Sequence, residues 1–349
     1  MKNYICEYFK ILYNLIMLFM EVLQLECFLK NSESYVLNEF EFSDGTVLND
    51  VEVEYLTVGT PKYDENGNIC NAVVYCHGSG GSYSSVKKLA DLAYSGGPFD
   101  KNKYFFISLS GLGSSKSCSP STTGLYYNFP QYDVVDMVNF QKKFLEDKFN
   151  ISHIKGIIGN SMGGFVALTW AALYPDYMDF IIALVTSYKT AGHNYILSKV
   201  IDDIIKSDPD YGIVEDSDSL RRTLKLASEA IFNYGMSKEF YRNQTLKEID
   251  DSMEEFLEEE LSSDIYDVKY QNDAMIKYDI EDLLKNIKAK VLIVGVNQDQ
   301  YFPPKLDAIP MSKMIEDSQL VIIDSELGHL GVSSLEGIRN ELDEFIKGA

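Results

Sequence analysis

The stretch Gly159-Asn160-Ser161-Met162-Gly163 decides how the rest of this chain is interpreted. A short apolar run, residues 154–158, precedes it, and an apolar run with helical spacing, residues 162–173, follows it. A serine between two glycines at a strand-to-helix junction is typical of a nucleophile elbow, in which only tiny neighbours avoid collision. In such a turn the hydroxyl projects above the sheet edge, beside a helix N-terminus that favours negative charge. The pattern therefore predicts that Ser161 is a catalytic nucleophile.

Short segments rich in Val, Ile, Tyr and Phe predict β-strands before and after this turn. Apolar residues alternate in the first two segments, which is typical of an antiparallel hairpin at the edge of a sheet. The other segments show little alternation, as expected of strands that are buried on both faces. In chain order the segments are residues 36–42, 51–58, 72–76, 104–108, 154–158, 180–185, 291–296 and 320–323.

Helical segments separate several of these strands. Helical spacing of apolar residues predicts helices over residues 136–148 and 334–347, the second opened by a capping pair, Ser333 and Glu336. Alternation of strands and helices is the pattern of an α/β protein. The sequence therefore predicts a mostly parallel, doubly wound sheet.

One region breaks the alternation, because residues 190–277 show helical patterns only. Its densest acidic run, residues 254–260, predicts a solvated helical face. The region lies between the sixth and seventh predicted strands, at the edge of the sheet where the elbow is expected. We predict a helical lid of residues 190–277 on a core of residues 34–189 and 278–349. The alternative is a helical domain with no role in gating.

The first 33 residues predict an N-terminal apolar helical extension. Residues 11–20 are nearly all apolar, but Glu7, Glu21 and Glu26 surround them, and the run is short for a membrane span. No small-residue cleavage site of a secretory signal follows. We expect an amphipathic helix that packs on the domain or on a partner; attachment to a membrane surface is the alternative.

Composition narrows the functional classes. The chain has 349 residues, 46% of them hydrophobic, and a net charge of −22, which opposes binding to nucleic acid or to an anionic membrane. The chain has five cysteines, an odd number, and none of them has C-x-x-C spacing. This is expected of reduced thiols in a cytoplasmic protein. With neither an H-E-x-x-H motif nor a Cys/His cluster, we expect no metal and no cofactor. The expected partner is a small-molecule acyl substrate, with homodimer formation left open.

A serine hydroxyl becomes a good nucleophile only when a base takes its proton, and histidine is the usual base. Of the four histidines, His153 precedes the nucleophile strand, His193 opens the helical region and His77 belongs to the loop after the third strand. His329 directly follows the last strand, so it lies at the same sheet edge as the elbow. We therefore predict that His329 is the general base, against the alternative of a solvated loop histidine.

The base needs a carboxylate that fixes its tautomer and stabilises the imidazolium ion. Asp299 follows the seventh predicted strand at the correct sheet edge and precedes His329, giving the chain order Ser, Asp, His. Asp324, five residues before His329, is the alternative. Two backbone donors must also hold the oxyanion, and we expect one from the N–H of Met162 and one from the glycine-rich stretch at residues 77–81.

These residues resemble the α/β-hydrolase superfamily, and more closely its homoserine O-acetyltransferase-like branch. The resemblance covers about residues 75–329 and implies the α/β-hydrolase fold with an inserted helical lid. It also implies that the second oxyanion donor is the N–H of Ser79, with Gly78 as the alternative. The stretches that carry it are Asp136-Met137-Val138 with Gln141, residues 159–164 with Ala167-Leu168, Trp170 and Tyr174-Pro175-Asp176, the loop 111–124, Phe129-Pro130, Tyr278-Asp279, and Asp299 with Phe302-Pro303-Pro304.

The departures from this branch concern the substrate. Members that acetylate homoserine carry an acidic residue directly after the catalytic histidine, where this chain has Leu330. Their elbow helix has Glu before the Trp, where this chain has Thr169, and the stretch 77–81 is more esterase-like than theirs. The resemblance therefore implies substrate-binding positions at Leu330 and Thr169, but supports homoserine as the substrate poorly.

Three functions follow from these observations. The first is a serine hydrolase that cleaves a small carboxylic ester, thioester or lactone through an acyl-enzyme on Ser161. The second is an O-acyltransferase that uses the same acyl-enzyme, with an alcohol in place of water. The third is a binding protein that retains the fold without catalysis.

Overall fold

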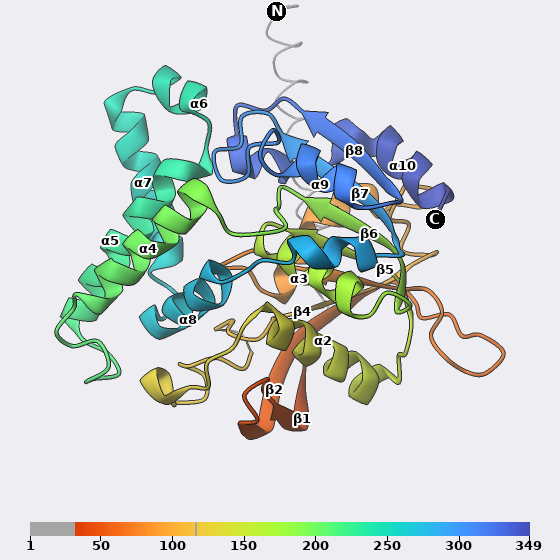
Figure 1. Cartoon of the computed structure of the whole chain (residues 1–349), viewed down its shortest axis with the longest axis horizontal. Coiled ribbons are helices and arrows are strands. Elements are labelled where there is room, and N and C mark those ends of the chain that lie inside the picture. The colour runs from red at the N-terminus through yellow and green to blue at the C-terminus, as the bar shows by residue number, and fades with distance from the viewer. Residues whose placement is uncertain (1–31, 116) are drawn as a thin grey trace, which may run out of the picture.

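The computed structural model describes residues 32–115 and 117–349, so nearly all of the predicted N-terminal extension (1–33) lies outside the described residues. An eight-stranded sheet with the order β1-β2-β4-β3-β5-β6-β7-β8 forms the centre of the molecule (Figure 1). The strands are β1 (Ser32–Glu41), β2 (Val47–Val58), β3 (Ala72–Cys76), β4 (Phe105–Leu109), β5 (Ile154–Asn160), β6 (Met178–Leu184), β7 (Lys290–Val296) and β8 (Ser318–Ile323).

The pairing of the strands confirms the predicted fold class. Strand β2 pairs antiparallel with β1 and β4, and every other neighbouring pair is parallel. Strands β3 and β4 are buried along their whole length. Because the strands from β3 to β8 run parallel, the loops after β3, β5, β7 and β8 all open at one edge of the sheet.

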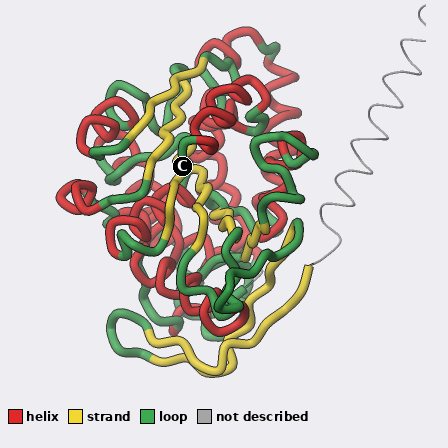
Figure 2. Tube along the Cα trace, turned by 90° about the vertical axis from the view of Figure 1, so that its right-hand side faces the viewer, coloured by secondary structure: helices red, strands yellow, loops and turns green. Residues whose placement is uncertain are grey.

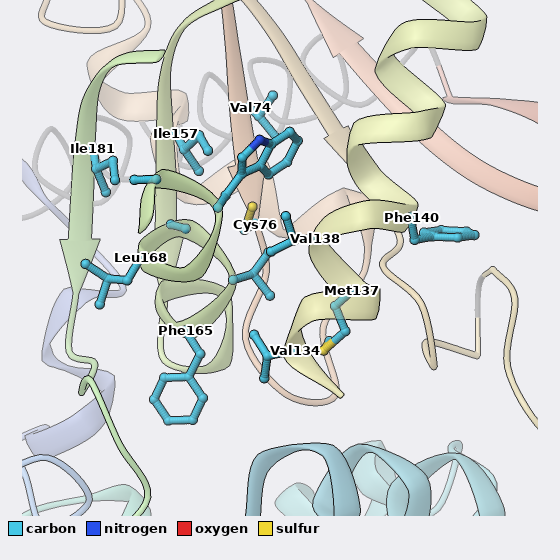
Figure 3. Packing of buried hydrophobic residues seen from close by; sticks show 14 of the residues in the cluster. Val74, Cys76, Val134, Met137, Val138, Phe140, Ile157, Phe165, Leu168 and Ile181 are labelled. Carbon is cyan, nitrogen blue, oxygen red and sulfur yellow. The ribbon is translucent and has the colours of Figure 1, made fainter. Parts of the chain in front are cut away.

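Helices cover both faces of this sheet, as Figure 2 shows by the red helices on either side of the yellow strands. One face carries α2 (Val134–Phe149), α3 (Met162–Leu173) and α9 (Ala308–Met314), and the other carries α10 (Arg339–Lys347) and the 3-10 helix Tyr83–Leu92. Side chains alternate between the two cores along β3: Val74 packs toward α2 and α3, whereas Val73 packs on the opposite face. Figure 3 shows Val138 of α2 and Leu168 of α3 in the first of these cores.

The C-terminal helix begins later than the sequence predicts. A short 3-10 helix, Glu336–Ile338, precedes α10, which starts at Arg339. The predicted capping pair of Ser333 and Glu336 is wrong, because Ser333 has helical backbone angles and ends the preceding 3-10 helix. An N-cap residue needs extended backbone, which Ser333 does not provide.

Residues 190–277 form a helical insertion between β6 and β7, beside the sheet in Figure 1. Its two ends run side by side: the Thr190 N–H donates to the Tyr278 carbonyl at 2.8 Å, and the Ile280 N–H donates to the Tyr188 carbonyl at 2.9 Å. The inserted helices bury an apolar core of their own, which includes Ile205. No helix among the described residues is long and apolar enough to cross a bilayer. The helices are α4 (Gly192–Lys206), α5 (Asp218–Gly235), α6 (Lys238–Asn243), α7 (Leu246–Glu260) and α8 (Ile265–Ile276).

A buried carboxylate ties this insertion to the core. Asp267 of α8 accepts hydrogen bonds from the Ser121 N–H at 2.9 Å and from the Ser121 hydroxyl at 2.6 Å. Burial raises the pKa of Asp267 from 3.8 to about 6, more than these two donors lower it. Since the folded-state pKa is the higher one, the associated stability is present below about pH 4 and is lost as the pH rises through about 6.

Substituting Asp267→Asn is therefore expected to stabilise the protein near neutral pH but not in acid. Between pH 4 and pH 7, the difference in unfolding free energy between the variant and the wild type should change by about 3 kcal/mol in favour of the variant. The Ser121 hydroxyl can reverse its hydrogen bond, so the contact with the amide survives. Denaturant titration at several pH values measures the difference, with exposed Asp250→Asn on α7 as the control. If the difference in unfolding free energy between Asp267→Asn and the wild type does not vary with pH, the raised pKa of Asp267 is contradicted.

Candidate active site

Ser161 lies in a strained turn between β5 and α3. Its backbone angles are φ 54° and ψ −121°, a conformation that a residue with a side chain rarely adopts. The end of β6 and the residues after it hold the turn: the Ser161 N–H donates to the Leu184 carbonyl at 3.0 Å, and the Thr186 hydroxyl donates to the Ser161 carbonyl at 2.9 Å. The geometry is that of a nucleophile elbow.

The positions two residues before and after Ser161 have no room for a side chain, so both must be glycine. A Cβ on Gly159 would collide with the carbonyl oxygen of Gly163. A Cβ on Gly163 would collide with the carbonyl oxygen of Cys76, at the end of β3. The elbow is therefore packed directly against the strand that leads into residues 77–81.

The structure brings Ser161, His329 and Asp299 into one chain of hydrogen bonds. His329 Nε2 lies 3.0 Å from the Ser161 hydroxyl, and His329 Nδ1 lies 2.9 Å from Asp299 Oδ2. His329 belongs to the 3-10 helix Gly328–Val332 after β8, and Asp299 follows β7. Three loops that open at the same sheet edge thus supply the three side chains.

The surroundings of Asp299 fix its orientation. Its side chain is fully buried, and Oδ1 accepts hydrogen bonds from the N–H groups of Tyr301 at 2.7 Å and Phe302 at 3.1 Å. Only Oδ2 is therefore directed at His329. The alternative carboxylate, Asp324, is exposed and accepts from the side-chain amide of Asn297 at 2.8 Å.

Two aromatic rings, those of Tyr301 and Phe302, pack against the imidazole of His329. The sequence did not predict this position for Tyr301. The ring centroids of Tyr301 and Phe302 lie 4.8 Å and 5.6 Å from that of His329. Their positions two and three residues after Asp299 are the only signal in the sequence. Because both N–H groups bind the Asp299 carboxylate, one short turn orients the acid and packs against the base.

Two backbone N–H groups near Ser161 are without hydrogen-bond acceptors among the described residues. Within residues 32–115 and 117–349, neither the Met162 N–H nor the Ser79 N–H donates a hydrogen bond to another residue. The Ser79 hydroxyl lies 3.8 Å from the Met162 sulfur, so the two residues are neighbours. Gly78 packs against the elbow, where a Cβ would lie 3.0 Å from the Asn160 side-chain nitrogen. The geometry suits an oxyanion hole made by Met162 and Ser79.

His77 supports this arrangement from behind, a function that the sequence analysis did not assign. Its buried ring accepts a hydrogen bond from the Gly111 N–H through Nε2 at 2.9 Å. Nδ1 therefore carries the proton and donates a hydrogen bond to the Gly78 carbonyl at 2.8 Å. Burial lowers the pKa of His77, which favours this neutral form. Its place at the start of a glycine-rich stretch is the signal in the sequence.

The other predicted site residues lie apart from this chain of hydrogen bonds. Thr169 is 1% exposed in α3, and its hydroxyl has no hydrogen-bond partner among the described residues. Leu330 follows His329 and is 44% exposed. Their roles in substrate binding stay predictions. Among the remaining histidines, His153 pairs with Asp179 and His193 is exposed at the start of α4.

The helical insertion contacts the loops after β3, β7 and β8. The Ser79 hydroxyl lies 3.4 Å from the sulfur of Met275 in α8, and Asn194 of α4 donates to the Tyr301 carbonyl at 2.6 Å. The Ser237 N–H, between α5 and α6, donates to the Glu326 carbonyl in the loop of His329 at 3.2 Å. No group of three or more His, Cys, Asp or Glu side chains in the described part of the chain is arranged to hold a metal ion.

Comparison with known proteins agrees with this architecture. Residues 71–332 match the family model of the alpha/beta hydrolase fold. A probable acyltransferase of Methanothermobacter thermautotrophicus is 44% identical, over 90% of this chain and 97% of its own length. A homoserine O-acetyltransferase of Methanosalsum zhilinae is 30% identical, over 76% of this chain and 61% of its own length. An acetylester hydrolase from Corynebacterium glutamicum has a similar structure, with a TM-score of 0.79 at 22% identity over 90% of this chain and 96% of its own.

Proposed function

The chain belongs to the alpha/beta hydrolase fold family, and we propose that it is a serine hydrolase that cleaves a small carboxylic ester through an acyl-enzyme on Ser161. One observation carries the proposal: the unbroken chain of hydrogen bonds from Ser161 through His329 to Asp299. Thioesters and lactones present the same electrophilic carbonyl and fall within the same substrate class.

In the first step the Ser161 oxygen attacks the ester carbonyl while His329 Nε2 takes its proton. Asp299 accepts the Nδ1–H of His329, so the lone pair of Nε2 faces the serine. The carbonyl oxygen becomes an oxyanion and accepts hydrogen bonds from the N–H groups of Met162 and Ser79. Each such donor contributes about 3 kcal/mol to the stabilisation of the transition state.

The tetrahedral intermediate collapses when the bond to the leaving alcohol breaks. The Nε2–H of His329 protonates the alcohol oxygen, and the acyl group stays on Ser161. A water molecule then gives its proton to His329 and attacks the acyl carbonyl, which releases the acid and restores the Ser161 hydroxyl.

An O-acyltransferase is the second candidate, favoured by the 44% identity to a probable acyltransferase. It differs only in the last step, where the hydroxyl of an acceptor alcohol replaces water. The contacts of α4, α8 and Ser237 with the loops of the site support the predicted lid over residues 190–277. Such a cover favours transfer when it excludes water from the acyl-enzyme.

A fluorophosphonate probe tests the serine chemistry. The wild-type protein is expected to bind one probe covalently, and peptide mass spectrometry should place it on Ser161. The variant Ser161→Ala serves as the control and should remain unlabelled. Absence of labelling in the folded wild type would overturn both the hydrolase and the transferase proposals.

Product analysis distinguishes hydrolysis from transfer. A short-chain acyl ester and an acyl-CoA are each offered with and without an alcohol acceptor, homoserine among them. We expect free acid as the main product from the ester. Acyl transfer to the alcohol that outpaces hydrolysis would favour the transferase instead.

A further inference from the structure

One carboxylate of the helical insertion lies next to the proposed oxyanion hole without a partner of its own. Glu260 is the last residue of α7 and is half-buried. A Cβ placed on Gly80 would lie 3.6 Å from Glu260 Oε1, so the carboxylate faces residues 77–81 across van der Waals distance. The Glu260 carboxylate makes neither an ion pair nor a hydrogen bond with another side chain or backbone group of residues 32–115 and 117–349.

Glu260 is also near enough to Tyr301 for its charge to act on that residue. Burial raises the pKa of Tyr301, and the negative charges of Asp299 and Glu260 raise it further; the Tyr301 ring lies 4.8 Å from the imidazole of His329. Gly80 and Tyr301 come from different loops, and each lies beside a different part of the proposed machinery. The Glu260 carboxylate therefore lies next to the loop of the proposed oxyanion donor Ser79, and its charge acts on a residue that packs against the general base.

Glu260 differs from the acidic residues that precede it. Glu254, Glu255, Glu258 and Glu259 are exposed, as the sequence analysis expected for the whole run. Glu260 alone turns inward, and burial raises the pKa of its carboxyl. A partly desolvated carboxylate without a partner is costly unless a ligand compensates it.

We propose that Glu260 selects substrates whose alcohol part carries a positive charge, such as an ester of an amino alcohol or of a quaternary ammonium alcohol. The inference rests on the proposed function. His329 protonates the leaving alcohol, so the alcohol part lies beside His329 and Tyr301, where the charge of Glu260 acts. The Glu260 carboxylate attracts such a cation and repels an anionic alcohol part.

Three acetate esters that differ in charge test the inference. Acetylcholine carries a positive charge, 3,3-dimethylbutyl acetate is its neutral isostere, and the acetate ester of 3-hydroxypropionate is anionic. The wild type is expected to show a kcat/KM about tenfold higher for acetylcholine than for the neutral ester. The anionic ester should be the poorest substrate of the three.

In Glu260→Gln the ratio of kcat/KM between acetylcholine and the neutral ester should fall about tenfold, and the anionic ester should gain relative to both. Glu259→Gln removes the same charge from the exposed neighbour and should keep the wild-type ratio. Equal turnover of the cationic and neutral esters by the wild type, or the same loss in both variants, would overturn the inference. A different result would contradict the proposed function itself: none of the esters would be cleaved, and the fluorophosphonate would not label Ser161.

Discussion

Replacing Asp299 by Asn is expected to lower kcat/KM about 10⁴-fold while leaving the fold intact. The structure indicates which way the new amide turns. Oδ1 accepts hydrogen bonds from the N–H groups of Tyr301 and Phe302, so the amide oxygen stays there and the NH₂ group faces His329. Nδ1 must then accept a hydrogen bond, which places the imidazole proton on Nε2. In that tautomer His329 cannot take the proton of Ser161.

Asp324→Asn is the matched control, because this carboxylate follows β8 and binds the side chain of Asn297. Steady-state kinetics on a chromogenic acetate ester gives kcat/KM for both variants, and circular dichroism checks that each is folded. A mild effect of Asp299→Asn together with a severe effect of Asp324→Asn would contradict the proposed assignment of the acid.

Replacing Gly163 by Ala is expected to reduce both stability and activity. The new Cβ would collide with the Cys76 carbonyl oxygen and lie 2.7 Å from that of His77. Either the start of α3 or the end of β3 has to move, at a cost of about 3 kcal/mol in the free energy of unfolding. Met162 begins α3 and Ser79 lies three residues after β3, so a shift of either segment moves one N–H group relative to the other, and we expect kcat/KM to fall about 10²-fold.

Gly337→Ala is the control for this prediction, since nothing lies within 4 Å of the Cβ that it adds. Denaturant titration gives the free energy of unfolding, and ester hydrolysis gives kcat/KM. A Gly163→Ala protein as stable and as active as the Gly337→Ala protein would show that the elbow tolerates a side chain at this position.

The sheet and the central site residues could be predicted because their signals are local. Apolar segments indicate buried strands, and the end of each strand fixes the sheet edge at which the next residues lie. Ser161, Asp299 and His329 lie in the connections after three parallel strands, so topology alone predicted that they would meet. The structure places them within hydrogen-bond distance of one another.

Features that depend on contacts between distant segments could not be predicted. Asp267 and Ser121 are 146 residues apart, and nothing in either segment indicates the other. Glu260 belongs to the same acidic run as the exposed glutamates, and nothing in the run indicates that its carboxylate meets residues 77–81. The predicted start of the C-terminal helix was wrong. Ser333 and Glu336 fit a capping pattern, but Ser333 has helical backbone angles because it ends the preceding 3-10 helix.

The paired ends of the helical insertion have an evolutionary consequence. Tyr188 and Thr190 bond to Ile280 and Tyr278, so the 88 residues from 190 to 277 leave and rejoin the core at a single point. A change of length within this segment can leave the pairing of β6 with β7 intact, because the same two hydrogen bonds hold both of its ends. The insertion, which carries Glu260, can in this way diverge while the loops that hold Ser161, Asp299 and His329 stay on the sheet.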